Sequence, residues 1–232
     1  MKSPPMNQTF LAAAVTEFGA MPRRGLVYAG AVGLTSATFD LVHWLHRTEA
    51  PLDYVGILVL LAVWSPTAYA MSMLMIQARW SWRGFGKFLA TTLAVVSPVL
   101  LAIAVLLVAK TFAGHAGLVL TIVLAAALSL VGVVLVTLLS GWPILQAVSP
   151  RFVGPTAALK ATEGLRWPLV MASFAQSALN RAGPNTSTAG DLPTACLFAA
   201  VNGLVACGSL MLTVSLAVVA WRHMASRVAY PS

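Results

Sequence analysis

The stretch Gly117–Gln146 reads GLVLTIVLAAALSLVGVVLVTLLSGWPILQ, and it decides the fold class. From Thr111 to Pro150 the chain contains no Asp, Glu, Lys or Arg. About 20 apolar residues in an α-helix cross the roughly 30 Å hydrocarbon core of a bilayer. The sequence therefore predicts an integral membrane protein, because a soluble domain has no need of so long an uncharged segment.

The composition extends this prediction to the whole chain. Of the 232 residues, 59% are apolar and 9% are charged, whereas soluble proteins carry roughly 25% charged residues. Backbone groups that face lipid must form their hydrogen bonds internally, which restricts spanning structures to helices and closed barrels. The apolar runs are continuous and do not alternate as barrel strands do. We expect an all-α polytopic helical bundle that forms one integral membrane domain over residues 1–232.

Six apolar segments are predicted to be transmembrane helices. They cover residues 26–46, 54–77, 88–108, 117–140, 166–181 and 194–221. The fifth has an apolar part of only twelve residues, Pro168–Leu179, which gives about 18 Å of helix. It must either extend into its flanks or enter the membrane without crossing it.

Two further segments are predicted to be amphipathic helices at the membrane surface. In residues 7–21, one side at helical spacing consists of Phe10, Leu11, Ala14, Phe18 and Met21. A leader without regular structure is the alternative for this segment. For residues 156–166 the alternative is a plain connector.

The predicted faces of residues 156–166 separate small from charged side chains. The first face consists of Ala157, Ala158, Ala161 and Leu165, and the second of Lys160, Glu163 and Arg166. Such a helix is suited to lie on a membrane or on a cytoplasmic partner.

The net charge is +8, and the distribution of the Lys and Arg residues predicts the orientation of the chain in the membrane. With both termini in the cytoplasm, eleven Lys or Arg residues lie on the inner side and three, Arg47, Lys110 and Arg181, on the outer side. This asymmetry follows the positive-inside rule. Because the cations flank apolar spans, we expect them to meet anionic headgroups or a partner rather than nucleic acid. The predicted contacts are Arg23, Arg24, Arg79, Arg83, Lys87, Lys160 and Arg166, with Trp80, Trp82, Trp142, Trp167 and Trp221 as interfacial anchors.

Asp40 is the one acidic residue inside a predicted span, and His43 follows it at i+3. A carboxylate at the bilayer centre costs about 3 kcal/mol on insertion scales, so it is a functional hypothesis by default. A proton- or ligand-binding site would use this pair. A packing hydrogen bond, or a carboxylate that reaches the outer headgroups, is the alternative. Asn202 in the last span is expected to form a hydrogen bond across helices.

A metal site is not predicted. His46 and His115 also belong near the outer surface, but they lack ligand-type spacing with Asp40. No cofactor is expected for the same reason.

Proline interrupts three apolar segments. Pro66 and Pro98 fall within predicted spans, and Pro143 follows the fourth. Proline removes a backbone hydrogen bond and kinks a helix, and broken helices are frequent in transporters. Kinks are also tolerated in membrane helices for packing alone.

The connector carries a family resemblance. Trp142-Pro143 ends a span, and residues 153–167 read VGPTAALKATEGLRW. This resembles the membrane domain found beside bacterial glycerophosphodiester phosphodiesterases, and the multispan plan is similar to that of the Yip family. The resemblance implies a bacterial inner-membrane location. No counterpart of the phosphodiesterase catalytic domain is present, so it implies no hydrolase activity.

No enzymatic function is expected, because the sequence contains no Gly-rich phosphate loop, His-Glu-x-x-His or Gly-x-Ser-x-Gly pattern. The predicted function is that of a non-catalytic integral membrane protein. It would be an accessory subunit, or a factor that organises lipid or a membrane complex, with a membrane-protein partner or a second copy. The alternative is a small transporter or channel with a site at Asp40 and His43.

Overall fold

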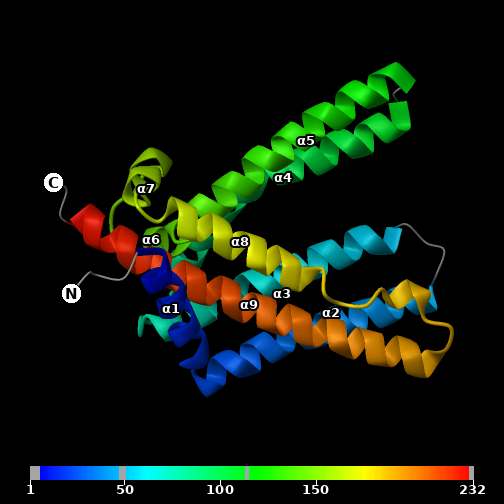
Figure 1. Ribbon diagram of the computed structural model, residues 1–232, viewed down its shortest axis with the longest axis horizontal. Coiled ribbons are helices and arrows are strands. Elements are labelled where there is room, and N and C mark those ends of the chain that lie inside the picture. Colours follow the sequence, from blue (N-terminus) through cyan, green and yellow to red (C-terminus); the bar gives the residue numbers. More distant parts are fainter. Residues whose placement is uncertain (1–5, 47–50, 113–114, 230–232) are drawn as a thin grey trace. The chain divides into compact units, whose positions relative to one another are not determined.

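The computed structural model describes residues 6–46, 51–112 and 115–229, and the regular structure within these ranges is entirely helical (Figure 1). This confirms the predicted all-α class. The elements are α1 (Met6–Gly19), α2 (Arg23–Leu45), α3 (Pro51–Met75), α4 (Trp82–Phe112), α5 (His115–Leu138), α6 (Trp142–Val148), α7 (Pro155–Ala161), α8 (Arg166–Asn180), the 3-10 helix η1 (Thr186–Thr188) and α9 (Leu192–Ala229).

Four of the helices are long and apolar enough to cross a membrane. They are α2, residues 82–106 of α4, residues 121–138 of α5 and residues 192–228 of α9, and they match the first, third, fourth and sixth predicted spans. By length and composition they support a membrane protein. The second predicted span coincides with α3, which has 25 residues. The fifth coincides with α8, whose 15 residues give about 22 Å of helix.

The chain divides into two compact units. Unit 1 comprises residues 1–81 and 171–219, and unit 2 comprises residues 82–170 and 220–232. Both α8 and α9 contribute residues to each unit.

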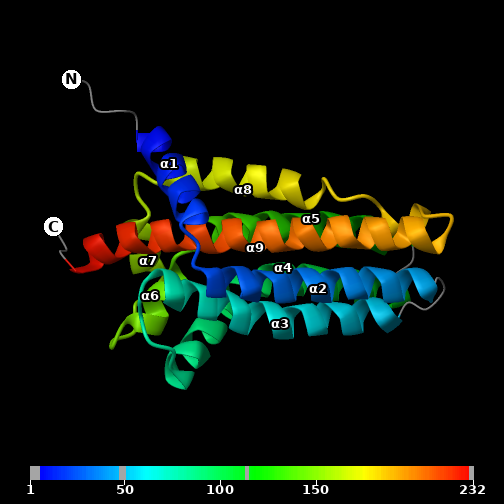
Figure 2. The ribbon, with the colours of Figure 1, turned by 90° about the horizontal axis from the view of Figure 1, so that it is seen from below.

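In unit 1, α2 packs along α3 on one side and against α9 on the other (Figure 2). The contact between α2 and α9 is made by backbone. A Cβ atom placed on Gly33 would lie 2.6 Å from the carbonyl oxygen of Gly203, and the reverse distance is the same. Two helices approach this closely only where both residues lack side chains, as is common in membrane helix pairs.

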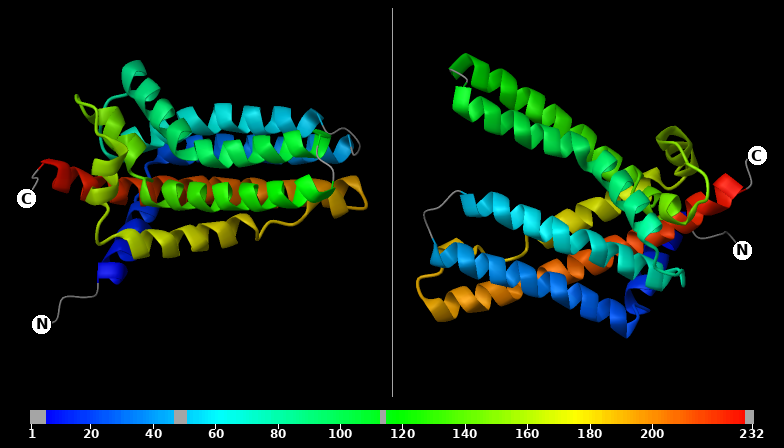
Figure 3. Two further views of the ribbon diagram at one scale, coloured as in Figure 1. Left: turned by 90° about the horizontal axis from the view of Figure 1, so that it is seen from above. Right: turned by 180° about the vertical axis from the view of Figure 1, so that it is seen from behind.

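In unit 2, α4 and α5 form a long antiparallel pair, and α6 packs against α4 (Figure 3). Only 17% of the residues in the spanning windows of α4 and α5 are buried, so their apolar side chains are largely exposed. A compact core forms where α6 and α7 meet this pair. Its buried members are Val95, Leu139, Trp142, Leu145, Val153, Ala158, Ala161 and Met224.

The predicted helix over residues 156–166 is shorter in the structure. α7 ends at Ala161, and Arg166 begins α8. Gly164 lies between them with φ 86°, a left-handed conformation that glycine adopts readily and that ends helices. Ala157 is exposed, although its predicted neighbours Ala158, Ala161 and Leu165 are buried.

The side chains on the predicted face of the first helix also differ in burial. Phe10 and Ala14 on α1 are buried, whereas Leu11 and Phe18 are exposed. The apolar side chains of this helix therefore do not share one environment.

Trp142 differs from the predicted interfacial anchor. Its side chain is 5% exposed, and its indole Nε1 donates a hydrogen bond to the carbonyl oxygen of Val153 at 2.8 Å. Pro143 lies in the first turn of α6 rather than at a kink within a helix. The chain turns at Gly141, where a Cβ would lie 2.5 Å from the backbone nitrogen of Trp221, so the segment after α5 folds back into the core.

Candidate functional site

Asp40 lies in a polar cluster that joins three segments of unit 1. The carboxylate oxygen Oδ2 of Asp40 on α2 accepts a hydrogen bond from Nδ2 of Asn202 on α9 at 2.6 Å. The hydroxyl of Thr186 in η1 donates to the same oxygen at 3.5 Å. Nδ2 of Asn202 also donates to Oγ1 of Thr186 and to the carbonyl oxygen of Pro184, each at 3.1 Å. A carboxylate, a carboxamide, a hydroxyl and a backbone carbonyl thus converge.

Close contacts at glycine residues place Asp40 beside Asn202. The backbone contact of Gly33 with Gly203 brings α2 and α9 together two turns away from Asp40. Gly183 lies against Asn202, and a Cβ on Gly183 would overlap Oδ1 of that side chain. Larger residues at these glycines would separate the members of the cluster.

The segment between α8 and α9 is held against α2 by its own local structure. Asn185 caps η1, because its side-chain oxygen accepts from the backbone N–H of Ser187 at 3.1 Å. The indole of Trp44 donates to the carbonyl oxygen of Ala189 at 3.1 Å. Thr186 and Ala189 are buried. This segment therefore forms a folded cap at the end of α2 where Asp40 lies.

Asp191 immediately precedes α9 at the end of the same segment. Its carboxylate accepts from the backbone N–H of Thr194 at 2.8 Å. Hydrogen bonds from the side chain and backbone of Thr194 hold the pKa of Asp191 below its usual value. A carboxylate in this position compensates the unpaired N–H groups of the first helical turn.

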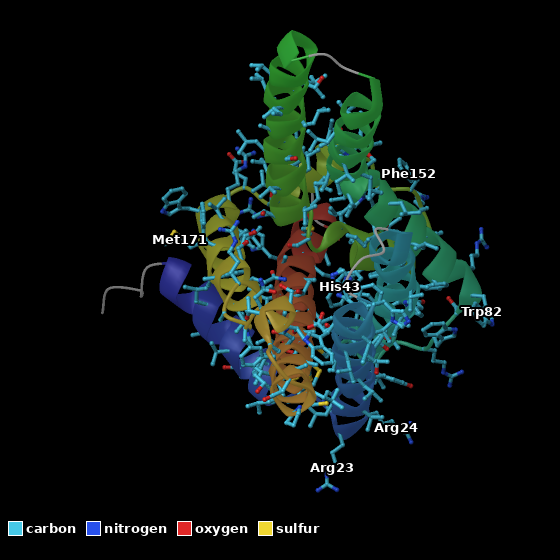
Figure 4. All side chains as sticks on the ribbon, turned by 90° about the vertical axis from the view of Figure 1, so that its right-hand side faces the viewer. Arg23, Arg24, His43, Trp82, Phe152 and Met171 are labelled. Carbon is cyan, nitrogen blue, oxygen red and sulfur yellow. The ribbon has the colours of Figure 1, made fainter. Side chains whose placement is uncertain are left out.

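His43 lies one turn beyond Asp40 on α2 and is half-buried (Figure 4). The hydrogen bonds described for the Asp40 carboxylate come instead from α9 and η1. His46 lies beside the carbonyl oxygen of Val42 at 3.0 Å, and the side chain of His115 lies outside the described residues. Across the described part of the chain, no three His, Cys, Asp or Glu side chains group in a way that suits a metal ion.

Pro66 lies within α3 and Pro98 within α4. Gly132 on α5 faces the second of these, because a Cβ placed there would lie 3.5 Å from Cβ of Pro98. The proline of α4 is therefore packed against a residue without a side chain.

The predicted basic contacts lie at the ends of helices. In unit 1, Arg23 and Arg24 are exposed at the start of α2 and point away from it, and Arg79 is exposed beyond α3 (Figure 4). In unit 2, Nζ of Lys87 donates to the carbonyl oxygen of Ser149 at 2.7 Å. This hydrogen bond links α4 to the segment after α6. The other cations at the same end of unit 2 are exposed: Arg83, Arg151, Lys160, Arg166, Arg222 and Arg227.

Large aromatic side chains accompany these cations. Trp82 is 77% exposed, Phe152 74% and Trp167 64%. Figure 4 shows Trp82 extending away from the ribbon. The sequence identified the cations and both tryptophans, but it did not identify Phe152.

The sequence also did not place Thr186, Pro184 and Gly183 beside Asp40. The run Asn185-Thr186-Ser187 is typical of a capped turn, but nothing in it specifies which helix the turn contacts.

No protein-family model, no curated protein and no solved structure matches this chain.

Proposed function

We propose that the protein is a non-catalytic, six-span membrane protein that binds anionic lipid at its cytoplasmic face and thereby organises lipid or a membrane complex around it. In this topology the spans are α2, α3, α4, α5, α8 and α9, and both termini lie in the cytoplasm of a bacterial inner membrane. The observation that supports it most directly is the basic and aromatic end of unit 2.

The charge at this end is strongly one-sided. It carries seven cations, Arg83, Lys87, Arg151, Lys160, Arg166, Arg222 and Arg227, and one carboxylate, Glu163. They lie at the start of α4, around α6 and α7 and at the end of α9, which meet away from the far ends of the α4–α5 pair (Figure 1). Each Lys or Arg close to an anionic membrane surface contributes about 1 kcal/mol.

The exposed aromatic side chains suit the same surface. Trp82 and Trp167 each border an apolar helix, and tryptophan is enriched at the level of the lipid headgroups. A soluble partner would leave the exposed apolar residues of α4 and α5 in water, whereas a bilayer covers them without a further protein. Lipid is therefore the partner that the surface fits best.

The test removes three exposed cations, Arg83→Gln, Lys160→Gln and Arg166→Gln together, from the purified full chain. Retention of phosphatidylglycerol over phosphatidylcholine is measured by native mass spectrometry in mixed micelles. At about 1 kcal/mol per cation, the preference should fall roughly 100-fold. The control is Arg181→Gln, which removes an exposed cation from the loop proposed to lie outside. An unchanged preference in the triple variant would refute the lipid-binding role.

A small transporter or channel is the second candidate. It is favoured by the half-buried Asp40 carboxylate inside an apolar helix. Solute uptake by vesicles that contain the protein, compared with the Asp40→Asn variant, tests it. Equal uptake by both variants would exclude a role for this carboxylate.

A further inference from the structure

The loop between α6 and α7, residues 149–154, is held in place by two side chains of α6. Nε1 of Trp142 donates to the carbonyl oxygen of Val153 at 2.8 Å. The carboxamide of the buried Gln146 accepts from the backbone N–H of Val153 at 2.9 Å, and its Nε2 lies 3.5 Å from the carbonyl oxygen of Arg151. Both backbone groups of Val153 are therefore bonded to the helix before the loop.

The start of the 149–154 loop is held by α4. Nζ of Lys87 on that helix donates to the carbonyl oxygen of Ser149 at 2.7 Å. Because α4 and α6 pack against each other within unit 2, the groups that hold the two ends of the loop belong to one compact body. Supporting hydrogen bonds of this kind fix the geometry of the residues that a binding surface presents. We expect the loop to keep its shape without a partner.

The side chains that the loop exposes are apolar and basic. Phe152 is largely exposed, although the next residue, Val153, is buried. Arg151 is exposed on its other side, and Val148 at the end of α6 is exposed as well. Apolar side chains next to a cation suit the boundary between lipid headgroups and acyl chains, where the apolar part is buried and the charge stays at the surface.

The charge of unit 2 favours a membrane as the surface that covers Phe152. The sequence of this unit contains one side-chain carboxylate, Glu163, so phosphate groups are attracted to it. A guanidinium such as that of Arg151 pairs with phosphate through two parallel hydrogen bonds. The exposed apolar residues of α4 and α5 in the same unit also require lipid around them. One bilayer satisfies all three requirements.

We propose that the 149–154 loop is a preformed membrane anchor, in which Phe152 inserts below the phosphates of the inner leaflet and Arg151 binds a lipid phosphate. The anchor rests on the proposed function, because that function places this end of unit 2 at the cytoplasmic face. It goes further, since attraction by dispersed cations requires neither an inserted side chain nor a loop of fixed shape. The anchor gives the core around α6 and α7 a defined depth in the headgroup layer.

The experiment measures the depth of residue 152 in the membrane by electron paramagnetic resonance. Phe152→Cys is combined with Cys196→Ala and Cys207→Ala in the full chain, labelled with an apolar nitroxide and reconstituted into vesicles of phosphatidylethanolamine and phosphatidylglycerol. Accessibility of the label to oxygen, which concentrates among acyl chains, is compared with its accessibility to a water-soluble nickel chelate. The oxygen-to-nickel ratio at 152 should be several-fold higher than in the control Gly190→Cys, at an exposed residue where a Cβ meets no atom within 4 Å.

A third label, at Trp167→Cys, separates the anchor from the proposed function. Trp167 is exposed at the same end of unit 2, and the proposed function places it among the headgroups whether or not the loop inserts. A high ratio at 167 with a ratio at 152 equal to that at 190 would overturn the anchor alone. Ratios at 152 and 167 that both equal the ratio at 190 would overturn the proposed function and the anchor together. Protection of the label at 152 from both reagents would show that protein covers the loop, which also overturns the anchor.

The fixed shape of the loop is tested by Gln146→Leu in the chain labelled at Phe152→Cys. The substitution removes the acceptor of the Val153 N–H, so the label should become more mobile and its oxygen-to-nickel ratio should fall. Lys87→Met, which removes the donor at the start of the loop, should act in the same direction without changing the buried core. Gln176→Leu removes a carboxamide from α8 and should alter neither quantity. Unchanged mobility and depth in both loop variants would refute the preformed shape.

Discussion

The substitution Gly33→Ala tests the backbone contact that positions the polar cluster. A Cβ at this position would lie 2.6 Å from the carbonyl oxygen of Gly203 and 3.3 Å from Cβ of Cys207. The first of these atoms belongs to the backbone of α9, so it cannot move aside as a flexible side chain can. The helices must separate instead.

The expected cost follows from two opposing effects. Forcing an extra methyl group into a packed contact costs about 1–3 kcal/mol. Replacing glycine by alanine within a helix returns up to about 1 kcal/mol of intrinsic helix preference. Because the clash is with backbone, we expect the upper part of the first range and a net loss of about 2 kcal/mol.

Reversible unfolding in a titration of denaturing detergent measures this loss. Gly30→Ala is the matched control, because it lies one turn earlier on α2 and a Cβ there meets no atom within 4 Å. It should be neutral or slightly stabilising. On α9, Gly203→Ala and Gly208→Ala form the equivalent pair, since Gly203 contacts Gly33 and Gly208 is open. The reasoning fails if Gly33→Ala is as stable as Gly30→Ala.

Two further substitutions test unit 2. Trp142→Phe removes the donor to the Val153 carbonyl and should destabilise the protein by about 1–3 kcal/mol, measured by the same titration. The control Trp82→Phe changes an exposed tryptophan and should leave the stability unchanged. Equal stability of the two variants would contradict the structural role of Trp142. Gly164→Ala places a side chain at φ 86° and should cost about 1 kcal/mol. Gly154→Ala, at φ −66°, should be tolerated, because a Cβ there makes only an ordinary contact with Oγ1 of Thr156 at 4.0 Å. A neutral Gly164→Ala would show that the turn between α7 and α8 can rearrange.

The sequence predicted helix type and approximate position well, but it predicted helix ends less well. The first span was expected to begin at residue 26, yet α2 begins at Arg23. The third was expected to begin at residue 88, yet α4 begins at Trp82. Hydropathy marks where a segment stops being apolar, whereas a helix continues as long as its backbone hydrogen bonds do. Long basic side chains can extend toward the headgroups from within the helix.

Long-range packing accounts for the other differences. Trp142 and Trp82 both flank apolar helices in the sequence, and only the return of α6 into the core makes the first one buried. The predicted helix over residues 156–166 ends at Ala161 in the structure, because helical spacing describes how faces would align but not whether the backbone continues. Gly164, in a left-handed conformation, lies in the turn that separates α7 from α8.

The hydroxyl groups of the spanning helices help to explain why a carboxylate and a carboxamide link α2 with α9. Ser and Thr within helices donate to the backbone of their own preceding turn, as Thr35 does to Ala31 at 2.8 Å and Ser215 to Met211 at 2.8 Å. These hydroxyls are satisfied without a neighbouring helix. An ionised carboxylate has no hydrogen to donate, so Asp40 must find its donors elsewhere.

Those donors have to come from another segment, because the backbone N–H groups of a helix interior are already used. A carboxamide can both donate and accept, which makes Asn202 a suitable partner on α9. Exchange of Thr35 or Ser215 for alanine is therefore expected to have a smaller effect than loss of the Asp40 carboxylate or the Asn202 carboxamide, which join α2 to α9. In the α2–α9 pair, these two side chains thus add a specific hydrogen bond to the backbone contact of Gly33 with Gly203.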